Sequence, residues 1–367
     1  MDIKTLSPIL AAFRAEGTPV AAEEMKSGNI NATWRVDYEC RGARSRYILQ
    51  RVNTYVFREP GRMMENIRAV TEHLRRAVEA RGEDPVRRVL RMIPTQAGEM
   101  LYTDEKDSAW RMYVFIDDAF AYDAVDAAAF LQVGRGFGRF QRLLADFPAE
   151  QLYASIPDFH NTPQRIAQLE AAIREDRVHR AAGVREEIDF LLSRREVLCS
   201  VTRLIDAGAL PLRVTHNDTK SNNVMLDRAT GEALCVIDLD TVMPGSVLYD
   251  YGDAIRFGGN TAAEDEPDTA KISLDMEKTE AFTRGFIEET NGFLLENELR
   301  RLPLGIQVMT GELALRFLTD YLNGDVYFKT LYPEHNLVRT RAQMALLKDV
   351  ERRESDLAQM IEALLRS

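Results

Sequence analysis

Alternation of apolar and polar residues predicts strands in the first third of the chain. Residues 33–40 alternate and are rich in β-forming side chains, residues 41–44 form a turn, and residues 45–52 form a second such run. Two runs of this kind joined by a short turn predict an antiparallel hairpin. Residues 86–92 and 110–116 are two further strand candidates.

A helical pattern lies between these strands, after the break at Pro60 and Gly61. Its apolar positions recur on one helix face: Met64, Ile67, Val70 and Leu74. Spacings of three and four residues are typical of an amphipathic helix. The first part of the chain is therefore predicted to hold a helix set within an antiparallel sheet.

From about residue 118 the pattern becomes mostly helical. The expected helices span residues 126–147, 162–177, 185–207 and about 336–365. Thr162 is the expected N-cap of the second helix, with Pro163 at its first helical position. Gly208 is expected to close the third helix.

Two short strand-like runs interrupt the helical part, at residues 224–226 and 233–237, joined by a turn at residues 228–231. A small sheet-rich part followed by a larger helical part predicts an α+β, two-lobed fold. The predicted domains are residues 1–117 and residues 118–367. A ligand site is expected in the cleft between such lobes.

Composition and charge narrow the function classes. The net charge of −11 over 367 residues argues against a general DNA- or RNA-binding surface, but it permits nucleotide binding, which is handled locally. We find neither an apolar run of about 18 residues, as a membrane span needs, nor a secretory signal. The three cysteines lie far apart, which favours a reduced, cytoplasmic setting.

The segment 214–240 contains the chemistry-bearing residues. Asp218 lies on a polar loop that follows an apolar, strand-like run, and Asn223 closes that loop. Asp238 follows the strand candidate at residues 233–237. Phosphoryl transfer needs a carboxylate near the attacking hydroxyl and oxygen ligands for Mg²⁺. Asp218 can orient the hydroxyl and accept its proton, while Asn223 and Asp238 can bind the metal.

Other acidic and basic residues surround this core. Asp240 is expected to assist the metal, whereas Asp250 and Asp253 are expected to brace the loop by hydrogen bonding. Lys220 can neutralise charge that develops on the γ-phosphate, or it can be an ordinary surface lysine. Asn and Asp also favour simple turns. However, the loop with Asp218 and Asn223 and the segment with Asp238 both adjoin apolar strand candidates, which favours a phosphoryl-transfer site.

The pattern H-x-D-x-x-x-x-N (His216, Asp218, Asn223) together with Ile237-Asp238 resembles the loops of the aminoglycoside phosphotransferase and choline kinase superfamily. The strings HNDTKSNNVMLD, VIDLDTVMPG and YDYGDAIRFGGN look closest to N-acetylhexosamine 1-kinases. The resemblance implies a protein-kinase-like fold, Asp218 as catalytic base, and Asn223 and Asp238 as Mg²⁺ ligands. It implies that His216 braces the loop.

The first lobe matches this family less closely. Ser27, Gly28 and Asn29 precede a strand, as a nucleotide-covering loop should, although a plain hairpin turn fits as well. By the resemblance, Phe115 and Asp117 lie at the hinge, where backbone groups would meet the nucleotide base.

The phosphate-binding lysine expected from the resemblance is missing from residues 45–52, where Arg51 or Gln50 occupies its place. Arg51 is the preferred candidate, because a guanidinium can hold phosphate oxygens and a neutral amide cannot replace that charge. Glu65 is the expected partner of the cation, with Glu72 as the alternative.

Acceptor residues are expected late in the chain, where Arg316, Asp320 and Tyr321 fall on related helical positions. Arg316 can bind a carbonyl or hydroxyls, and Tyr321 can offer a ring face. An amphipathic helix with a polar edge is the plainer interpretation. The aromatic residues in this region leave a choline-type cation cage possible: Tyr321, Tyr327, Phe328 and Tyr332.

Three functional hypotheses follow. The first is an ATP- and Mg²⁺-dependent kinase for the anomeric hydroxyl of an N-acetylhexosamine. The second is a kinase for another small alcohol, such as homoserine, choline or an aminoglycoside. The third is an inactive nucleotide-binding protein, which only the missing lysine supports.

Overall fold

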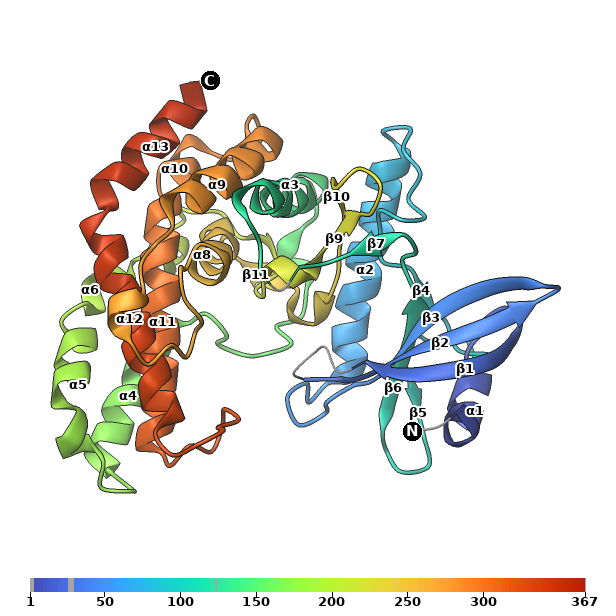
Figure 1. The fold of residues 1–367 in the computed structure, drawn as a ribbon, viewed down its shortest axis with the longest axis horizontal. Helices are drawn as coiled ribbons and strands as arrows, with labels where there is room; N and C mark the ends of the chain where they lie inside the picture. Colours follow the sequence, from blue (N-terminus) through green and yellow to red (C-terminus); the bar gives the residue numbers. More distant parts are fainter. Residues whose placement is uncertain (1–2, 26–29, 123, 367) are drawn as a thin grey trace. The chain divides into compact units, whose positions relative to one another are not determined.

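The computed structural model describes residues 3–122 except 26–29, and residues 124–366. The chain forms two compact units (Figure 1). The first unit contains residues 1–120, 150–157 and 225–243, and the second contains residues 121–149, 158–224 and 244–367. Each unit therefore combines three stretches of sequence, whereas the sequence pattern predicts one boundary after residue 117.

A mainly antiparallel sheet dominates the first unit. Its strands pair in the order β1-β2-β3-β6-β4, and β5 also pairs with β6. The bounds are β1 (Thr18–Met25), β2 (Ala32–Cys40), β3 (Ala43–Arg51), β4 (Met92–Ile93), β5 (Tyr102–Thr103) and β6 (Ala109–Val114). The predicted hairpin is confirmed, because β2 pairs with β3 along its whole length.

The predicted strand at residues 86–92 is wrong. The amides of Arg88 and Val89 both bond to the carbonyl of Pro85, which makes a turn, and only Met92 belongs to a strand. Val86 is exposed, whereas Val89 and Leu90 are both buried. Two consecutive buried residues are incompatible with the alternation that a one-faced strand requires.

The two faces of the sheet differ in chemistry. One face packs against α1 (Ile3–Ala11) through a cluster that includes Trp34, Leu49 and Trp110. On the other face Thr33, Gln50 and Arg111 lie opposite one another on adjacent strands. We call these last three residues the polar face of the sheet.

Helix α2 (Pro60–Glu79) confirms the predicted amphipathic pattern, because Met64, Ile67, Val70 and Leu74 are all buried. The Met64 sulfur lies 3.9 Å from Nη1 of Arg111, so α2 reaches the polar face of the sheet.

A smaller sheet contains the next strands, in the order β10-β9-β7. The bounds are β7 (Ala119–Phe120), β9 (Val224–Asp227) and β10 (Ala233–Val236), and β11 (Met243–Gly245) follows. The two short strands predicted from sequence are thus confirmed. Asp238 lies just beyond the end of β10.

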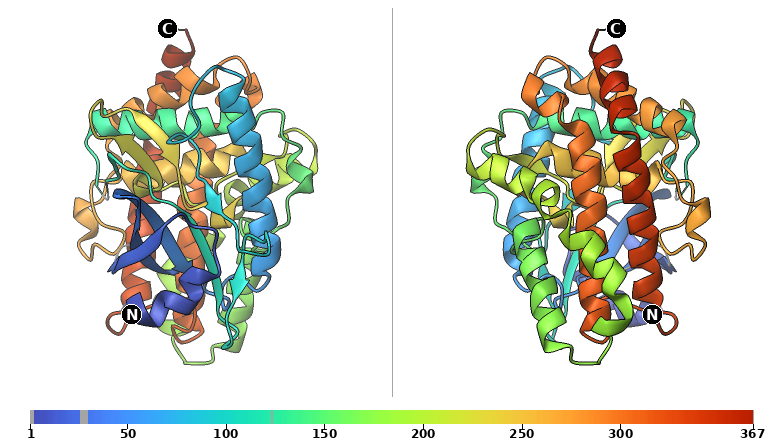
Figure 2. Two further views of the ribbon diagram at one scale, coloured as in Figure 1. Left: turned by 90° about the vertical axis from the view of Figure 1, so that its right-hand side faces the viewer. Right: turned by 90° about the vertical axis from the view of Figure 1, so that its left-hand side faces the viewer.

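Helices make up most of the second unit. They are α3 (Ala127–Leu143), α4 (Thr162–Glu175), α5 (Arg185–Leu192), α6 (Arg195–Leu198), α7 (Ser200–Asp206), α8 (Val247–Gly258), α9 (Met276–Thr290), α10 (Glu296–Leu299), α11 (Leu302–Leu322), α12 (His335–Arg352) and α13 (Glu354–Arg366). The short strand β8 (Arg213–Thr215) precedes the loop of residues 216–223 that carries Asp218, the predicted catalytic loop. Figure 2 shows α11 flanked by α4, α5 and α12.

Helices α3 and α9 approach so closely that a Cβ on Gly285 would lie 2.2 Å from the carbonyl oxygen of Leu131. None of the described helices is long and apolar enough to span a bilayer.

Two predicted long helices are broken in the structure. The helix expected at residues 185–207 is divided into α5, α6 and α7. At its breaks Ser193 and Ser200 donate hydroxyl hydrogen bonds to the carbonyls of Phe190 and Val197, at 2.7 and 2.6 Å. Hydroxyls that bond to the preceding turn compete with helix continuation. The last helix is divided at Arg353, whose side chain bonds to the buried carboxylate of Asp349.

The predicted N-cap of α4 is displaced by one residue. The Asn161 side chain accepts the hydrogen bond from the Gln164 amide, at 3.1 Å. Thr162 is fully buried instead, and its hydroxyl donates to Glu312 at 2.8 Å. The Thr162 hydroxyl, which was predicted to cap the helix, thus bonds to the distant Glu312 instead.

Candidate active site

The catalytic loop of the second unit presents one carboxylate from a buried frame. Thr215, His216 and Thr219 are completely buried, whereas the Asp218 side chain is 29% exposed. The loop follows β8 and ends in a short 3₁₀ helix (Ser221–Asn223). This frame leaves the Asp218 carboxylate within reach of a small ligand.

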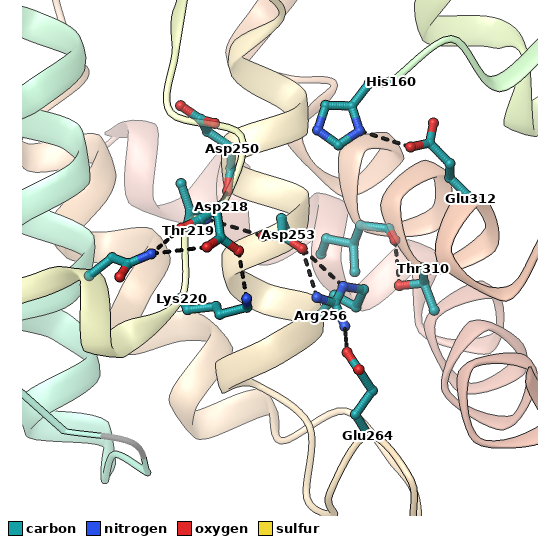
Figure 3. A network of polar contacts seen from close by, with 12 residues as sticks. His160, Asp218, Thr219, Lys220, Asp250, Asp253, Arg256, Glu264, Thr310 and Glu312 are labelled. Carbon is teal, nitrogen blue, oxygen red and sulfur yellow. Dashed lines mark hydrogen bonds and ion pairs between the residues drawn. The ribbon is translucent and has the colours of Figure 1, made fainter. Parts of the chain in front are cut away.

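Two predicted site residues contact Asp218 directly (Figure 3). Lys220 Nζ lies 2.8 Å from one carboxylate oxygen of Asp218. The amide nitrogen of Asn223 donates to the main-chain oxygen of Asp218 at 2.8 Å and to its other carboxylate oxygen at 3.2 Å. Burial by itself lowers the pKa of Lys220, but the charge of Asp218 outweighs burial and raises it. Lys220 therefore remains a cation beside the carboxylate.

Helix α8 holds the loop through hydrogen bonds to Asp250. The carboxylate of Asp250 accepts hydrogen bonds from the amides of His216 and Asn217, at 2.9 and 2.8 Å, and from Gln141 at 2.8 Å. Burial raises the pKa of this carboxyl group against these contacts. The bracing role predicted for Asp250 is confirmed.

Asp253, one turn further along α8, braces the next part of the loop. It accepts the amide of Thr219 at 3.1 Å and pairs with Arg256 at 2.8 Å, and Arg256 also pairs with Glu264 at 2.7 Å (Figure 3). His216 is likewise structural, because its Nδ1 accepts the Asp218 amide at 3.3 Å and its ring packs edge-on against Phe137.

Replacing Asp253 with Asn is expected to make the free energy of unfolding depend less on pH in the acidic range. Burial by itself raises the pKa of Asp253, but the positive charges of Arg256 and Lys220 lower it by more than burial raises it. The folded-state pKa therefore lies below the ordinary value of about 3.9. The ionised carboxylate then stabilises the fold above that ordinary value, and this contribution is lost as pH falls through the lowered pKa. Breaking such a buried pair costs about 3–5 kcal/mol at neutral pH.

Thermal unfolding at pH 7 and at pH 3 measures this effect. The deficit in melting temperature of Asp253→Asn should be large at pH 7 and shrink at pH 3. Asp189→Asn, an exposed change on α5, serves as control and should match the wild type. An equal deficit at both pH values would contradict the linkage.

In the first unit, Asp238 adopts an unusual backbone conformation. Its φ of 60° and ψ of 58° are left-handed, which few non-glycine residues adopt and which often occurs at functional sites. Asp240, two residues later, is buried, and its carboxylate accepts the Asn31 amide at 2.7 Å. Ser155 donates to its main-chain oxygen at 3.2 Å. Asp240 thus anchors the segment that carries Asp238.

Arg111 is the buried cation of this region, and sequence reasoning missed it. It is only 3% exposed, and its Nη1 pairs with Asp240. Its Nε and Nη2 both donate to Oε1, the side-chain oxygen of Gln50, at 2.8 and 2.6 Å. Burial by itself lowers the pKa of Arg111, but Asp240 outweighs it and, with a smaller contribution from Asp238, raises the pKa. The sequence did contain a sign of it: Arg111 stands between the apolar residues Trp110 and Met112 in strand β6, where a charged side chain is unusual.

The structure does not bring Arg51 to the polar face of the sheet, where Arg111 lies. Arg51 is exposed and lies on the sheet face opposite to Arg111, with its guanidinium 6.0 Å from the Trp110 ring. Gln50 lies on the polar face but is neutral. Glu65 and Glu72 are both exposed, and the carboxylate that pairs with Arg111 comes from Asp240 instead. Strand alternation decides this outcome, because neighbouring residues point to opposite faces.

The main-chain groups expected to meet the nucleotide base are engaged in the protein. The Phe115 amide donates to the Arg46 carbonyl at 3.0 Å. The carbonyl of Asp117 accepts from Arg87 at 2.8 Å, and its side chain pairs with Arg46 at 2.8 Å. Ser27, Gly28 and Asn29 lie outside the described residues.

The three predicted acceptor residues have different surroundings. The Arg316 guanidinium faces the rings of Phe159, Tyr327 and Phe328, at 5.4 to 6.0 Å. The Asp320 carboxylate is buried and accepts the amides of residues 326 to 328 and the side chain of Asn336. Tyr321 packs in the hydrophobic core, with Arg180 over its ring at 4.4 Å. Asp320 and Tyr321 thus have partners within the protein, whereas Arg316 is only partly buried.

Comparison with known proteins agrees with the fold and the loop. Residues 21–282 match the model of the phosphotransferase enzyme family. A microcompartment-associated aminopropanol kinase is similar over 97% of this chain and 99% of its own, at 15% identity and a TM-score of 0.58. A spectinomycin phosphotransferase solved with ADP and spectinomycin is similar over 99% of this chain and 98% of its own, at 12% identity and a TM-score of 0.55.

A choline kinase from Cryptosporidium parvum is similar over 94% of this chain and 93% of its own, at 12% identity and a TM-score of 0.56. At such identities these structures establish the fold alone. They confirm the predicted α+β, protein-kinase-like architecture, and the family match confirms the predicted enzyme class, a phosphotransferase. By its sequence match and its fold, the chain belongs to the phosphotransferase enzyme family.

Proposed function

We propose that this enzyme transfers the γ-phosphoryl group of ATP to a sugar hydroxyl, namely the anomeric hydroxyl of an N-acetylhexosamine. The observation on which the reaction rests is the partly exposed Asp218 carboxylate, held rigidly and paired with Lys220. The likeness of the strings around it to N-acetylhexosamine 1-kinases supports the acceptor.

Asp218 orients the acceptor hydroxyl and takes its proton as the hydroxyl oxygen bonds to the γ-phosphorus. The bond between that phosphorus and the bridging oxygen breaks, and ADP leaves. Lys220 stabilises negative charge on the transferred group, because it stays protonated beside Asp218. Positioning and electrostatics supply most of the rate enhancement in this chemistry.

The first unit is proposed to bind the nucleotide, which residues 1–117 were predicted to do. The likeness to a phosphotransferase solved with ADP supports an adenine nucleotide. Arg111 is proposed to take the place of the lysine that is missing from strand β3, and this role argues against an inactive protein.

The residues present fit Mg²⁺ as cofactor. Within the described residues, no group of three or more His, Cys, Asp and Glu side chains could hold a metal. Mg²⁺ is commonly bound through one or two carboxylates together with substrate phosphates. Asp238 and the amide oxygen of Asn223 would hold it, and the ion would neutralise phosphate charge.

A panel of acceptors with ATP and Mg²⁺, read out by ADP release, tests this function. N-acetylglucosamine and N-acetylgalactosamine should be phosphorylated with the highest kcat/KM. The panel includes choline, homoserine, aminopropanol and an aminoglycoside, the alternative small alcohols. A higher kcat/KM for one of these would replace the proposed acceptor, and no turnover of any would refute a kinase.

The free thiols of Cys40, Cys199 and Cys235 support a cytoplasmic setting. We propose small-molecule partners only, ATP and the acceptor, and neither nucleic acid nor a membrane.

A further inference from the structure

A cavity of about 530 Å³ lies on the first unit, at the end of the sheet where β3 begins and β6 ends. Its volume is within the range that is typical of small-molecule sites. Six charged residues line it: Arg14, Glu16, Arg44, Arg46, Arg91 and Asp117. Four arginines and two carboxylates give this lining a net charge of two positive units, on a chain whose net charge is −11. We call it the arginine cavity.

Main-chain hydrogen bonds bring these arginines together from separate segments of the sequence. Strand β6 lies between β3 and β4. The amide of Phe115 donates to the carbonyl of Arg46 at 3.0 Å, and the amide of Val114 donates to the carbonyl of Arg91 at 2.9 Å. Arg46 and Arg91 therefore flank β6, with main chains about 10 Å apart by the spacing of strands. Arg44 lies two residues before Arg46, so both side chains leave β3 on the same side.

The linker between α1 and β1 contributes the fourth arginine. The amide of Arg14 donates to the carbonyl of Pro94 at 2.8 Å, and its guanidinium donates to the carbonyl of Gln96 at 2.8 Å. The amide of Glu16 donates to the Tyr47 hydroxyl at 3.2 Å, which holds the linker against β3. Tyr47 also lines the cavity, and its hydroxyl can still donate its own hydrogen.

Three of the four guanidinium groups have no acidic partner among the residues that the structure describes. Arg46 pairs with Asp117 at 2.8 Å. Arg14, Arg44 and Arg91 are exposed and take part in no such pair. Positive groups gathered around one cavity repel each other, so an anion that binds between them relieves this repulsion.

The arrangement fits a phosphate monoester better than a carboxylate. A phosphate monoester has three terminal oxygens and nearly two negative charges at pH 7, so it can bond to arginines from several directions and offset the charge of the lining. A planar carboxylate carries one charge and pairs with a single guanidinium as a fork. The cavity also has an apolar wall, which can contact the organic part of the ligand: Met92, Ile93, Pro94 and Val114.

The cavity differs from the proposed site of the nucleotide phosphates. Gln50, which bonds to Arg111, lies four residues after Arg46 on β3, a separation of about 13 Å along the strand. Neither Gln50 nor Arg111 is among the described residues that line the cavity. Phe115 and Asp117, predicted to meet the nucleotide base, do line it. A neutral purine base, however, would leave the positive charge of the cavity uncompensated.

We propose that the arginine cavity is a second ligand site, which binds a small phosphate monoester with an apolar or ring-shaped organic part. Arg14, Arg44 and Arg91 hold the phosphate oxygens, and the apolar wall contacts the organic part. The site does not depend on the proposed transfer reaction, so binding alone tests it.

Calorimetric titration with phenyl phosphate, without Mg²⁺ and at constant ionic strength, is the first measurement. Phenyl phosphate should bind to the wild-type protein. Benzoate has the same ring but a planar carboxylate, and it should bind at least about 10-fold more weakly. Adenosine carries no phosphate, so it should occupy the nucleotide site without displacing phenyl phosphate.

The double variant Arg44→Met/Arg91→Met should weaken phenyl phosphate binding by about 10-fold or more, because hydrogen bonds to a charged group are lost. Its melting temperature should stay close to that of the wild type, since both side chains are exposed and have no acidic partner. Arg68→Met/Arg76→Met is the matched control. It removes two exposed arginines of α2, in the same unit but outside the cavity, and should bind phenyl phosphate as the wild type does.

Several outcomes would overturn the proposal. They are no binding of phenyl phosphate by the wild type, unchanged binding in Arg44→Met/Arg91→Met, equal loss in the control variant, and binding of benzoate as tight as that of phenyl phosphate. Displacement by adenosine would assign the cavity to the nucleotide base and refute a second site. Failure of the kinase function would alter none of these results, because they are measured without turnover.

Discussion

Asp218→Asn is expected to lower kcat by about 10²-fold or more, as expected for loss of a general base. The amide keeps the size of the side chain and can still accept the contact from Lys220, 2.8 Å away in the wild type. It cannot take the hydroxyl proton at neutral pH. The KM for ATP should therefore change little. Steady-state kinetics with ATP, Mg²⁺ and the best acceptor measure this split.

Two controls separate chemistry from folding. Asp189→Asn makes the same chemical change at an exposed position of α5 and should leave kcat unaltered. The melting temperature of Asp218→Asn should stay close to that of the wild type, because Asp218 is partly exposed and its loop is held by Asp250 and Asp253. An Asp218→Asn enzyme with undiminished kcat would refute the assignment of the base.

Arg111→Met is expected to impair both nucleotide binding and stability. Its guanidinium compensates the buried Asp240, and an uncompensated buried charge costs about 3–5 kcal/mol. Loss of a positive group near the phosphates should lower kcat/KM for ATP by about 10²-fold or more. The affinity for ADP should fall more than the affinity for adenosine, since only ADP carries phosphates. Calorimetry with both ligands measures the difference.

Variants at neighbouring positions keep this prediction testable. Arg51→Met removes an exposed arginine from the opposite face of the same sheet and should leave ADP affinity unchanged. The double variant Arg111→Met/Asp240→Asn removes the buried charge as well, so it should recover stability without recovering ADP affinity. If the double variant binds ADP as the wild type does, or if Arg51→Met loses it, Arg111 is not the phosphate-side cation.

Local sequence determined the elements whose pattern is complete within a short stretch. The β2–β3 hairpin and the buried face of α2 follow from alternation and from helical periodicity, and both are confirmed. The catalytic loop is also predictable from local sequence, because Asp218, Asn223, Asp238 and the strands beside them all lie within residues 213–240. Bracing by Asp250 was predicted from its place in the acidic cluster that follows Asp238, although its partner His216 lies 34 residues away in the sequence.

Tertiary packing decided whatever depends on which groups meet across the fold. Arg111 pairs with Gln50 and Asp240, which lie 61 and 129 residues away in the sequence. Asp320 and Tyr321 fit an acceptor site by spacing alone, yet the former binds a loop and the latter fills the core.

The breaks in the predicted long helices have a partly local origin, since the Ser193 hydroxyl bonds to the carbonyl of Phe190 three residues earlier. Asp349, near the second break, also accepts the amide of Leu274, which is distant in the sequence. Periodicity reports which face of an element is buried, but not what lies against it. A polar side chain acquires its role from partners that are brought close only by folding. The sequence by itself therefore determined the loop that carries Asp218 and the elements around it. The tertiary structure decided which cation pairs with Asp240 and which of the predicted acceptor residues have partners within the protein.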